Sequence, residues 1–321
     1  TLSPPLKKRI LGEFCDSGPL LSLIENLRVT EICVNGSNQI WYEIDGQLQS
    51  WQDRFFSGFT YENFIQRVFS DARVHIDLCQ PAVDGSWKEF RIHAVGKPLS
   101  PLGTVLTLRR HPQNSWTLEK LEEHGWACRN SLEKIANLVR QKQTILIAGP
   151  TGSGKTSILS ACLKNLAANE RRSEERRTRE IALPNPISLQ LLTREDLRTH
   201  LPRYTLSDLI RHSLRMRPDR LIMGEVRGPE AKDLVLLLST GHQGGLATIH
   251  ARDPHEALMR LEILIQLGAP QWRPETVRKL IFHGVQYVLL TERLENGQRQ
   301  FAGAYRLSSL ESTGFLLDRE F

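Results

Sequence analysis

The 321-residue chain is 40% hydrophobic and 24% charged, a globular composition that excludes disordered, collagen-like and disulfide-scaffold proteins. No apolar run approaches the roughly 18 residues that a membrane span requires, and the first residues lack the charged and apolar segments of a secretion leader. The formal net charge of +6 lies entirely after residue 110, because residues 1–110 hold twelve basic and twelve acidic side chains.

The first 110 residues predict a small α+β domain. Residues 29–34 and 40–44 alternate in polarity, and each run is followed by a turn signal, Asn-Gly or Asp-Gly. Apolar residues at helical spacing around 64–69 predict one amphipathic helix. Two further strands are expected at 91–95 and 104–108. The pattern then breaks, so we expect a linker over residues 111–130.

From residue 131 to 321, helical patterns alternate with short apolar strands. This alternation predicts an α/β domain with a mainly parallel sheet. The expected core strands are 144–148, 221–223 and 245–250, and the expected helices are 132–139, 155–168, 206–216 and 255–267. Residues 285–291 and 301–306 flank Asn296-Gly297, which predicts an antiparallel hairpin near the end of the chain.

The strongest motif is a phosphate-binding loop between a predicted strand and a predicted helix. It fills every fixed position of the pattern GxxxxGK[ST]. Glycines let backbone N–H groups approach phosphate oxygens, and the helix N-terminus favours an anion. We expect Lys155 to bridge the β- and γ-phosphates of ATP and Thr156 to bind Mg²⁺. The expected nucleotide-binding residues of this loop are Gly149, Pro150, Thr151, Gly152, Ser153, Gly154, Lys155, Thr156 and Ser157.

An acidic residue follows the second core strand. Glu225 comes after residues 221–223, where the carboxyl end of a parallel strand faces the phosphate crevice. A carboxylate at this place can orient or deprotonate the attacking water, directly or through the metal shell. Two histidines, His242 and His250, bracket a Gly-Gly turn and the next strand. They are candidate sensors of the γ-phosphate or proton relays, or else ordinary structural histidines.

Together these segments resemble the secretion "traffic" ATPases, the hexameric motors of type II and type IV secretion and of pilus assembly. The resemblance rests on the phosphate loop, on RMRPDR followed by an apolar strand and GEVRG (residues 215–228), and on TGHQGGLATIHA (residues 240–251). It is greatest for the branch that serves tight-adherence pili and conjugative type IV secretion. VTEICVNG (residues 29–36) and LTLRRHP (residues 106–112) resemble that branch's N-terminal domain, so most of residues 20–290 is covered.

The resemblance implies a RecA-like P-loop ATPase domain preceded by a smaller α+β N-terminal domain. It gives Glu225 the role of catalytic base and metal-shell residue, and it places His242 and His250 in a histidine box. Arginines of the N-terminal domain and linker, here Arg109 and Arg110, are expected to reach the phosphates. Further candidates, for charge stabilisation across a subunit boundary, are Arg215, Arg217 and Arg227.

The sequence departs from the family at one place. The family has an apolar strand that ends in Glu-Asp-x-x-Glu, whereas residues 170–180 hold five arginines and four glutamates. Glu180 can stand for the last glutamate, but arginines take the expected positions of the acidic pair, Arg177 among them. A charge run of this kind is typical of a solvated helix end or loop, so we expect no apolar strand here.

The predicted function is therefore a hexameric ATPase that uses ATP and Mg²⁺ to power pilus assembly or secretion of protein or DNA. Five scattered cysteines without metal or CxxC spacing indicate reduced thiols in the cytoplasm. The family adds a peripheral location at the inner membrane and partners among its platform proteins. Two alternatives remain: a RecA-like nucleic-acid motor, which the lack of interleaved basic and aromatic residues disfavours, and a nucleotide-binding assembly subunit with little hydrolysis.

Overall fold

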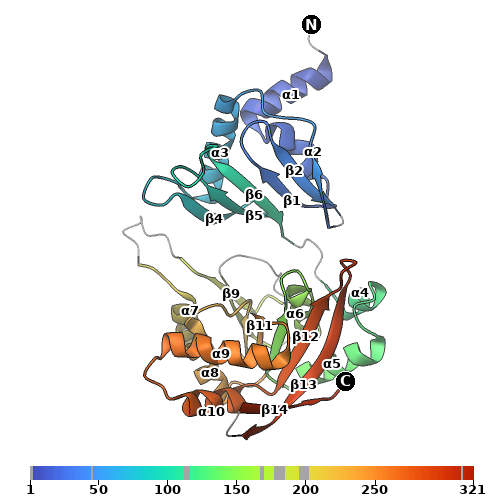
Figure 1. Cartoon of the computed structure of the whole chain (residues 1–321), viewed down its shortest axis with the longest axis vertical. Coiled ribbons are helices and arrows are strands. Elements are labelled where there is room, and N and C mark those ends of the chain that lie inside the picture. The colour runs from blue at the N-terminus through green and yellow to red at the C-terminus, as the bar shows by residue number, and fades with distance from the viewer. Residues whose placement is uncertain are drawn as a thin grey trace. The chain divides into compact units, whose positions relative to one another are not determined.

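The computed structural model describes residues 3–44, 46–111, 116–166, 170–176, 185–194, 202–311 and 314–321. The chain forms two compact units, Thr1–Gln113 and Asn114–Phe321, and each has its own sheet and hydrophobic core (Figure 1). Among the described helices, none combines the length and the apolar character that a membrane crossing requires.

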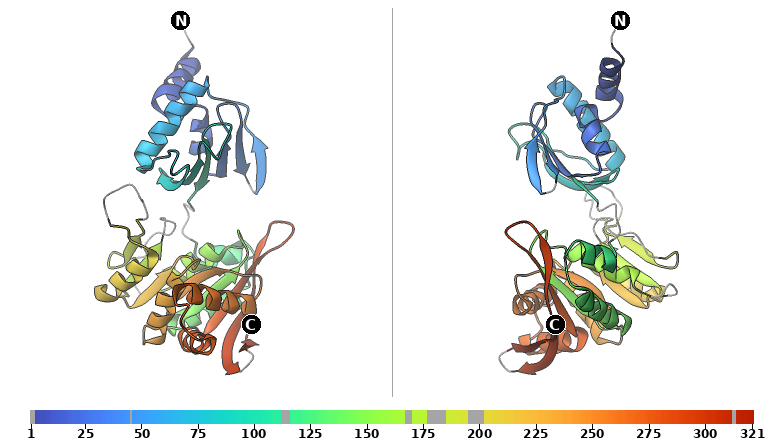
Figure 2. Two further views of the ribbon diagram at one scale, coloured as in Figure 1. Left: turned by 60° about the vertical axis from the view of Figure 1, so that its left-hand side comes forward. Right: turned by 90° about the vertical axis from the view of Figure 1, so that its right-hand side faces the viewer.

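The first unit is an antiparallel sheet with helices packed on one side (Figures 1 and 2). The strand order is β3-β2-β1-β6-β5-β4, and helix α3 begins at a capping box formed by Ser57 and Thr60. The buried face of α3 packs on the sheet through Phe64, Ile65 and Val68. The elements are α1 (Pro4–Cys15), η1 (Gly18–Leu20), α2 (Leu21–Glu25), β1 (Val29–Val34), β2 (Ile40–Ile44), β3 (Gln47–Ser50), α3 (Gly58–Ala72), β4 (Ala82–Trp87), β5 (Phe90–Val95) and β6 (Val105–Arg110).

The second unit is built on a sheet of eight strands in the order β14-β13-β12-β7-β11-β10-β8-β9. The pairs from β12 to β9 are parallel, while β12, β13 and β14 pair antiparallel, so the predicted terminal hairpin is confirmed. The strands are β7 (Ile145–Gly149), β8 (Arg172–Arg176), β9 (Leu189–Leu192), β10 (Arg220–Met223), β11 (Leu246–His250), β12 (Tyr287–Arg293), β13 (Arg299–Glu311) and β14 (Gly314–Arg319).

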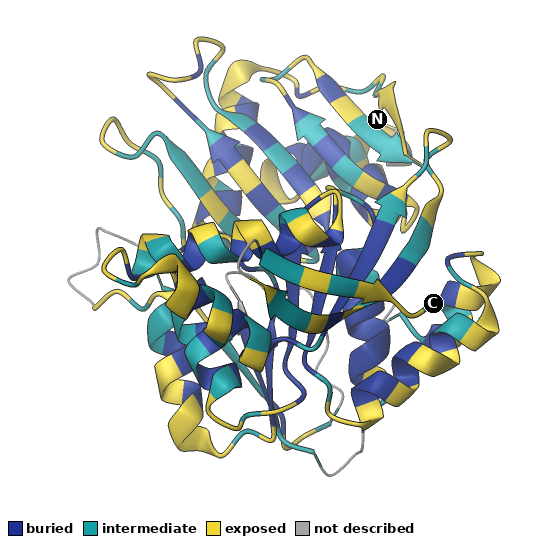
Figure 3. Cartoon of the chain, turned by 60° about the horizontal axis from the view of Figure 1, so that its bottom comes forward, coloured by how far each residue is buried: buried dark blue, intermediate teal, exposed yellow. Residues whose placement is uncertain are grey.

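Helices cover both faces of this sheet, so its central strands are buried on both sides and read as continuous apolar runs. One face packs against α7 to α10, and the other packs against α4 to α6. Figure 3 shows the result as dark blue central strands flanked by helices with exposed outer stripes. The helices are α4 (Leu118–Glu123), α5 (Arg129–Arg140), α6 (Lys155–Lys164), α7 (Leu206–Ser213), η2 (Leu214–Met216), α8 (Glu230–Ser239), α9 (Pro254–Gly268) and α10 (Pro274–Gly284).

The charged run after α6 is a buried strand, and the expectation of a solvated loop there is wrong. Strand β8 lies between β10 and β9, and Glu174 and Glu175 are 1% and 0% exposed. Glu175 is the strand partner of Met223, and its side chain lies on the face of the sheet that packs against α7. The Arg172 side chain lies on the opposite face, where its guanidinium donates to the carbonyl oxygen of Leu163 at 2.9 Å. Pairing on both edges satisfies the backbone, so the segment forms a strand without apolar side chains.

Burial raises the pKa of Glu175 to about 8. Its Oε1 accepts a hydrogen bond of 2.6 Å from Ser173 Oγ. A carboxyl group whose pKa is higher in the folded chain than in the unfolded chain holds a proton that unfolding releases. The stability contributed by this group is therefore full below about pH 4.5 and is lost as the pH rises to about 8.

We predict that Glu175→Gln raises the free energy of unfolding at pH 8 by about 1–3 kcal/mol and changes it little at pH 5, because glutamine carries no proton to lose. Urea unfolding of the full chain at both pH values measures the effect. Glu123→Gln, at an exposed position of α4, is the matched control. An equal change at both pH values would contradict the assigned pKa.

Candidate functional site

The expected phosphate loop lies at the carboxyl edge of the central parallel strands. Residues 150–154 join β7 to α6, and β11 pairs with β7 so that His250 lies beside Gly149. Gly152 and Gly154 have φ values of +74° and +95°, in the left-handed region that glycine adopts without strain. The loop is thus held in a conformation that turns backbone N–H groups toward one anion at the start of α6.

Strand β12 supports the loop from one side. Thr291, fully buried within β12, donates from Oγ1 to the carbonyl oxygen of Ala148 at 3.1 Å. Its hydroxyl also lies 2.7 Å from Ser153 Oγ. A β-carbon at Gly149 would collide with both hydroxyl groups, so only glycine fits at the first position of the motif. The motif predicts the glycine, but the sequence analysis did not identify Thr291, which is the last residue of the predicted strand 285–291.

The Lys155 amine folds back over the loop. Its Nζ donates to the carbonyl oxygens of Gly149 at 2.9 Å and Pro150 at 2.8 Å. It also lies 3.4 Å from His250 Nδ1, at the end of β11. The side chain is 7% exposed. Its position at the mouth of the loop lets it exchange these neutral acceptors for phosphate oxygens, which are stronger acceptors for an ammonium group.

Glu225 connects this amine to an arginine. The Nε2 atom of His250 lies 2.6 Å from Glu225 Oε1, and Arg227 forms an ion pair with Glu225 Oε2. Because His250 Nδ1 faces the Lys155 ammonium group, Nδ1 is the acceptor of the imidazole, and the Nε2 proton lies on the side of the carboxylate. The four side chains form one chain of contacts from Lys155 through His250 and Glu225 to Arg227.

Burial and charge set the protonation of this chain of contacts. Burial lowers the pKa of Lys155 to about 8, with the charge of Glu225 opposing the shift and that of Arg227 adding to it. Burial, followed by the Lys155 charge, lowers the pKa of His250. The contacts require a neutral histidine between the lysine and the carboxylate. The four side chains then carry one negative charge, on Glu225, beside the cationic Lys155 and Arg227, so the site is suited to a polyanion.

Hydrogen bonds position the residues that follow β10. The N–H of Val226 donates to the carbonyl oxygen of Thr248 at 2.8 Å, and Thr248 Oγ1 donates to the carbonyl oxygen of Gly224 at 2.6 Å. The buried Glu230 carboxylate accepts from the N–H groups of Arg227 and Gly228, both at 3.0 Å. The segment that carries Glu225 is thereby fixed against β11 on one side and α8 on the other.

The oxygen atoms near the loop fit a magnesium ion held mainly by substrate. Within the described residues, no group of three or more His, Cys, Asp or Glu side chains could enclose a metal ion. Mg²⁺ binds through one or two protein oxygens, phosphate oxygens and water rather than through a closed protein cage. The half-buried Thr156 hydroxyl at the start of α6 and the Glu225 carboxylate are hard oxygen donors of the required kind.

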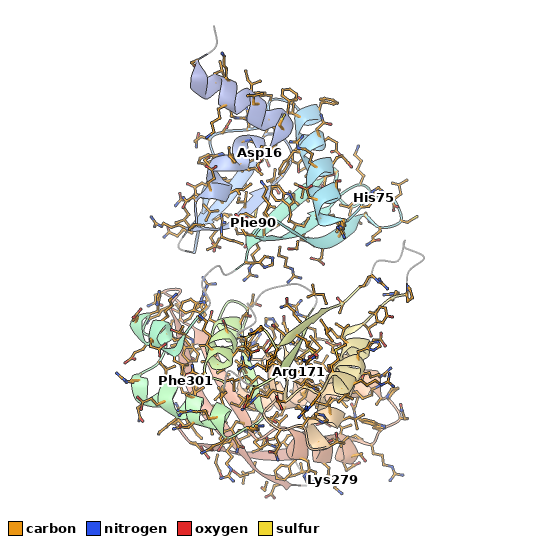
Figure 4. All side chains as sticks on the ribbon, turned by 180° about the vertical axis from the view of Figure 1, so that it is seen from behind. Asp16, His75, Phe90, Arg171, Lys279 and Phe301 are labelled. Atoms are coloured by element: carbon orange, nitrogen blue, oxygen red, sulfur yellow. The ribbon has the colours of Figure 1, made fainter. Side chains whose placement is uncertain are left out.

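The structure does not leave Arg110 available for phosphate binding, which corrects the expectation for this residue. It is 9% exposed within the first unit, where its guanidinium donates to the carbonyl oxygens of Val29 and Ile24, both at 2.7 Å. It also pairs with Glu89 at 2.9 Å and lies 4.4 Å over the ring of Phe90, labelled in Figure 4. These contacts hold β6 to α2. Arg109, the next residue back along β6, is exposed.

Three other predicted residues lie away from the loop of their own chain. His242 precedes β11, and Arg215 and Arg217 precede β10, whereas the loop lies at the carboxyl ends of these parallel strands. The structure therefore separates His242 from His250 by the length of β11, so that only His250 of the two candidate γ-phosphate sensors lies beside the loop of its own chain. The two arginines are exposed, as a role toward another subunit would require. Glu180 and Arg177 lie outside the described residues.

Comparison with known proteins relates the chain to secretion ATPases. A family model described as "Type II/IV secretion system protein" matches residues 63–300. A putative conjugal transfer protein of Mycobacterium tuberculosis is 31% identical over 297 residues, covering 90% of this chain and 84% of that protein. The type IV secretion system protein PtlH of Bordetella pertussis is 29% identical over 294 residues, covering 83% of this chain and 86% of that protein.

Among solved structures, the fold is similar to that of the Legionella pneumophila ATPase DotB. The TM-score is 0.65 at 18% identity, and the match covers 96% of this chain and 82% of that chain. The predicted fold class, a RecA-like α/β ATPase domain preceded by a smaller α+β domain, is confirmed.

We predict that the affinity for ATP falls about eightfold between pH 7.5 and pH 9, because Lys155 loses its charge through a pKa of about 8 unless phosphate is bound. Titration of the full chain with a fluorescent ATP analogue at both pH values measures the fall. Lys155→Arg is the matched variant, since arginine stays charged over this range. An equal fall in this variant would show that another group is responsible.

Proposed function

Because the chain belongs to the Type II/IV secretion system protein family, we propose that it is an ATPase that powers secretion or pilus assembly at a bacterial inner membrane. The observation that carries the proposal is the contact chain at the phosphate loop. It joins a loop lysine to a carboxylate at the end of a neighbouring strand through a neutral histidine. This places an anion-binding cradle beside a group that can act on water.

The residues have the following roles in hydrolysis. Backbone N–H groups of residues 151–156 bind the phosphates, and Lys155 leaves the loop carbonyls to neutralise the β- and γ-phosphates. Glu225 orients the attacking water and takes its proton. His250 Nε2 and Arg227 contact the two oxygens of the Glu225 carboxylate and hold it beside the loop. Thr156 and Glu225 would hold Mg²⁺, which neutralises charge that develops on the phosphates.

The proposed assembly is a homohexamer that is peripheral to the inner membrane on its cytoplasmic side and engages the system's platform proteins. Arg215 and Arg217 support it, because they are exposed at the sheet edge opposite their own phosphate loop. In a ring, such arginines can meet the nucleotide of a neighbour and stabilise the charge on its phosphates. Within the N-terminal domain, residues 1–110, Arg109 is the candidate for contact with the nucleotide phosphates. That domain is proposed to move on the ATPase domain, residues 131–321. The linker between them is shorter than the expected 111–130, because Leu118, Leu121 and Trp126 pack in the core of the second unit.

A second candidate function is a nucleotide-binding assembly subunit with slow hydrolysis. The observation that favours it is strand β8, which carries Glu174 and Glu175 inside the sheet and is followed by arginines at the expected positions of an acidic pair. Without those carboxylates, water and metal at the γ-phosphate have fewer acceptors. Turnover by the assembled protein distinguishes the two functions.

We predict that Glu225→Gln lowers kcat for ATP hydrolysis by about 10²- to 10⁴-fold and leaves ATP affinity near wild type, because the amide retains the contacts but cannot take a proton. Lys155→Ala is expected to lose both binding and turnover. Phosphate release by the assembled chain measures the effect, with exposed Glu275→Gln on α10 as control. Absence of turnover in the assembled wild type would favour the second candidate function.

We further predict that Glu225→Gln, loaded with ATP, captures an inner-membrane platform protein of a secretion or pilus system from detergent-solubilised membranes. Trapping the ATP-bound ring prolongs the contact that the wild type makes transiently. Lys155→Ala should capture less, since it binds no ATP. Recovery of nucleic acid without a platform protein would contradict the secretion assignment and support a nucleic-acid motor.

A further inference from the structure

Helix α1 has an apolar side that lies outside the core of the first unit. Four residues at one-turn intervals, or directly beside such a position, make up this side: Leu6, Ile10, Leu11 and Phe14. Within the residues that the structure describes, none of the four belongs to the hydrophobic core of this unit or packs against it. Leu11 and Phe14 are 64% and 52% exposed. This side of α1 therefore adds little to the hydrophobic stabilisation of the unit.

Polar contacts fix α1 to the unit from its other side. Arg9 Nε donates to Asp53 Oδ2 at 2.8 Å, and the N–H of Phe56 donates to Oε1 of Glu13 at 2.8 Å. Glu13 is fully buried and also forms an ion pair with Arg9. The helix thus turns its charged pair toward the unit and its apolar residues toward solvent. An exposed apolar surface of this kind is typical of a site that a partner covers.

The apolar side of α1 belongs to a projecting surface. Figures 1 and 2 show α1 on the outside of the first unit, with its first turns extending beyond the neighbouring helices. Phe56 is 52% exposed beside the helix, where the Arg9 guanidinium lies 4.5 Å from the centre of its ring. We call Leu6, Ile10, Leu11, Phe14 and Phe56 the α1 surface. Because it projects, it can lie against a flat partner.

Two lysines border the α1 surface. Lys7 lies one turn before Leu11, Lys8 follows it, and both side chains are exposed. Within the described part of the chain, neither ammonium group makes a hydrogen bond or an ion pair. The one acidic residue of α1 is the buried Glu13, whose charge is matched by Arg9. The exposed charge of this helix is therefore positive.

The carboxylates of the neighbouring segments have other partners. Asp53 pairs with Arg9, and Asp16, at the end of α1, pairs with Lys88 at 3.3 Å. Helix α3 and η1 are the elements that contact α1, and η1 holds no acidic residue. On α3, Asp71 accepts from Trp87 Nε1 at 3.0 Å, and Glu62 accepts from Gln66 of its own helix at 3.3 Å. Among the described residues, neither of these two forms an ion pair with Lys7 or Lys8.

We propose that the α1 surface docks on a bilayer that contains anionic lipids, an inference that rests on the proposed function and names the part of the ATPase that meets the membrane. A bilayer surface offers acyl chains to Leu11 and Phe14 and anionic headgroups to the lysines at the same time. The long stems of Lys7 and Lys8 let their ammonium groups reach the headgroups while the helix lies at the acyl boundary.

The test measures binding of the full chain to vesicles by flotation. Wild type is expected to bind vesicles of phosphatidylglycerol and phosphatidylcholine in equal parts, and to bind vesicles of phosphatidylcholine alone much less. Leu11→Gln and Phe14→Gln should each lower the partition coefficient by about tenfold, because an apolar side chain no longer enters the acyl boundary. Lys7→Gln and Lys8→Gln should each lower it by about fivefold on the anionic vesicles.

Two controls separate the α1 surface from general properties of the chain. Leu78→Gln removes another exposed apolar side chain of the first unit, and Lys279→Gln removes an exposed charge of the more basic second unit. Both should bind vesicles as wild type does. All variants should keep the melting temperature and the ATP turnover of wild type, since the α1 surface lies outside the core. If an apolar variant melts lower, Lys7→Gln decides, because it changes only an exposed charge.

Absence of wild-type binding to the anionic vesicles would overturn the proposal, as would equal binding by the α1 variants. Equal binding of wild type to phosphatidylcholine alone would also overturn it, because that result leaves the lysines no role. If Leu11→Gln lost capture of a platform protein while wild type bound no vesicles, α1 would dock on protein and not on lipid. Failure of the proposed function appears separately, as absence of ATP turnover in the assembled wild type.

Discussion

The parallel pairing of β12, β7, β11 and β10 is the constraint on which the site depends. Parallel strands place all their carboxyl ends at one edge of the sheet, and the loops that leave that edge meet there. Residues as far apart in sequence as Gly149, His250 and Thr291 become neighbours because of this single arrangement. Gly149, Thr291 and Ser153 then lock the phosphate loop against the sheet, in a contact too close for any β-carbon.

Once the loop is fixed, charge determines how the site behaves without substrate. Lys155, His250, Glu225 and Arg227 satisfy one another, and burial shifts two of them toward the neutral form. A polyanion reverses this balance, because phosphate oxygens draw the lysine away from the loop carbonyls. In the proposed mechanism the lysine then neutralises phosphate charge, and the Glu225 carboxylate acts on the attacking water.

Strand β8 shows how far backbone pairing can override side-chain preference. Its neighbours β10 and β9 supply hydrogen bonds on both edges, and so a sequence with three charged residues among four buried positions lies inside the sheet. The energetic cost appears in the raised pKa of Glu175 and in the hydrogen bonds that buried polar groups must find. A run of charged residues is thus a poor predictor of exposure for a segment that pairs with a neighbouring strand on each edge.

The sequence by itself determined the alternation of helices and strands, the phosphate loop, Glu225 and the terminal hairpin, because these depend on local periodicity and on motifs of fixed spacing. Tertiary structure alone decided the rest. It joined Lys155 to Glu225 through His250 and placed His242 at the far end of β11. It also buried Arg110 in the first unit and brought Thr291 to the loop. Each of these relations is set by which strands are neighbours, and the order of strands in a sheet is not written in the order of residues along the chain.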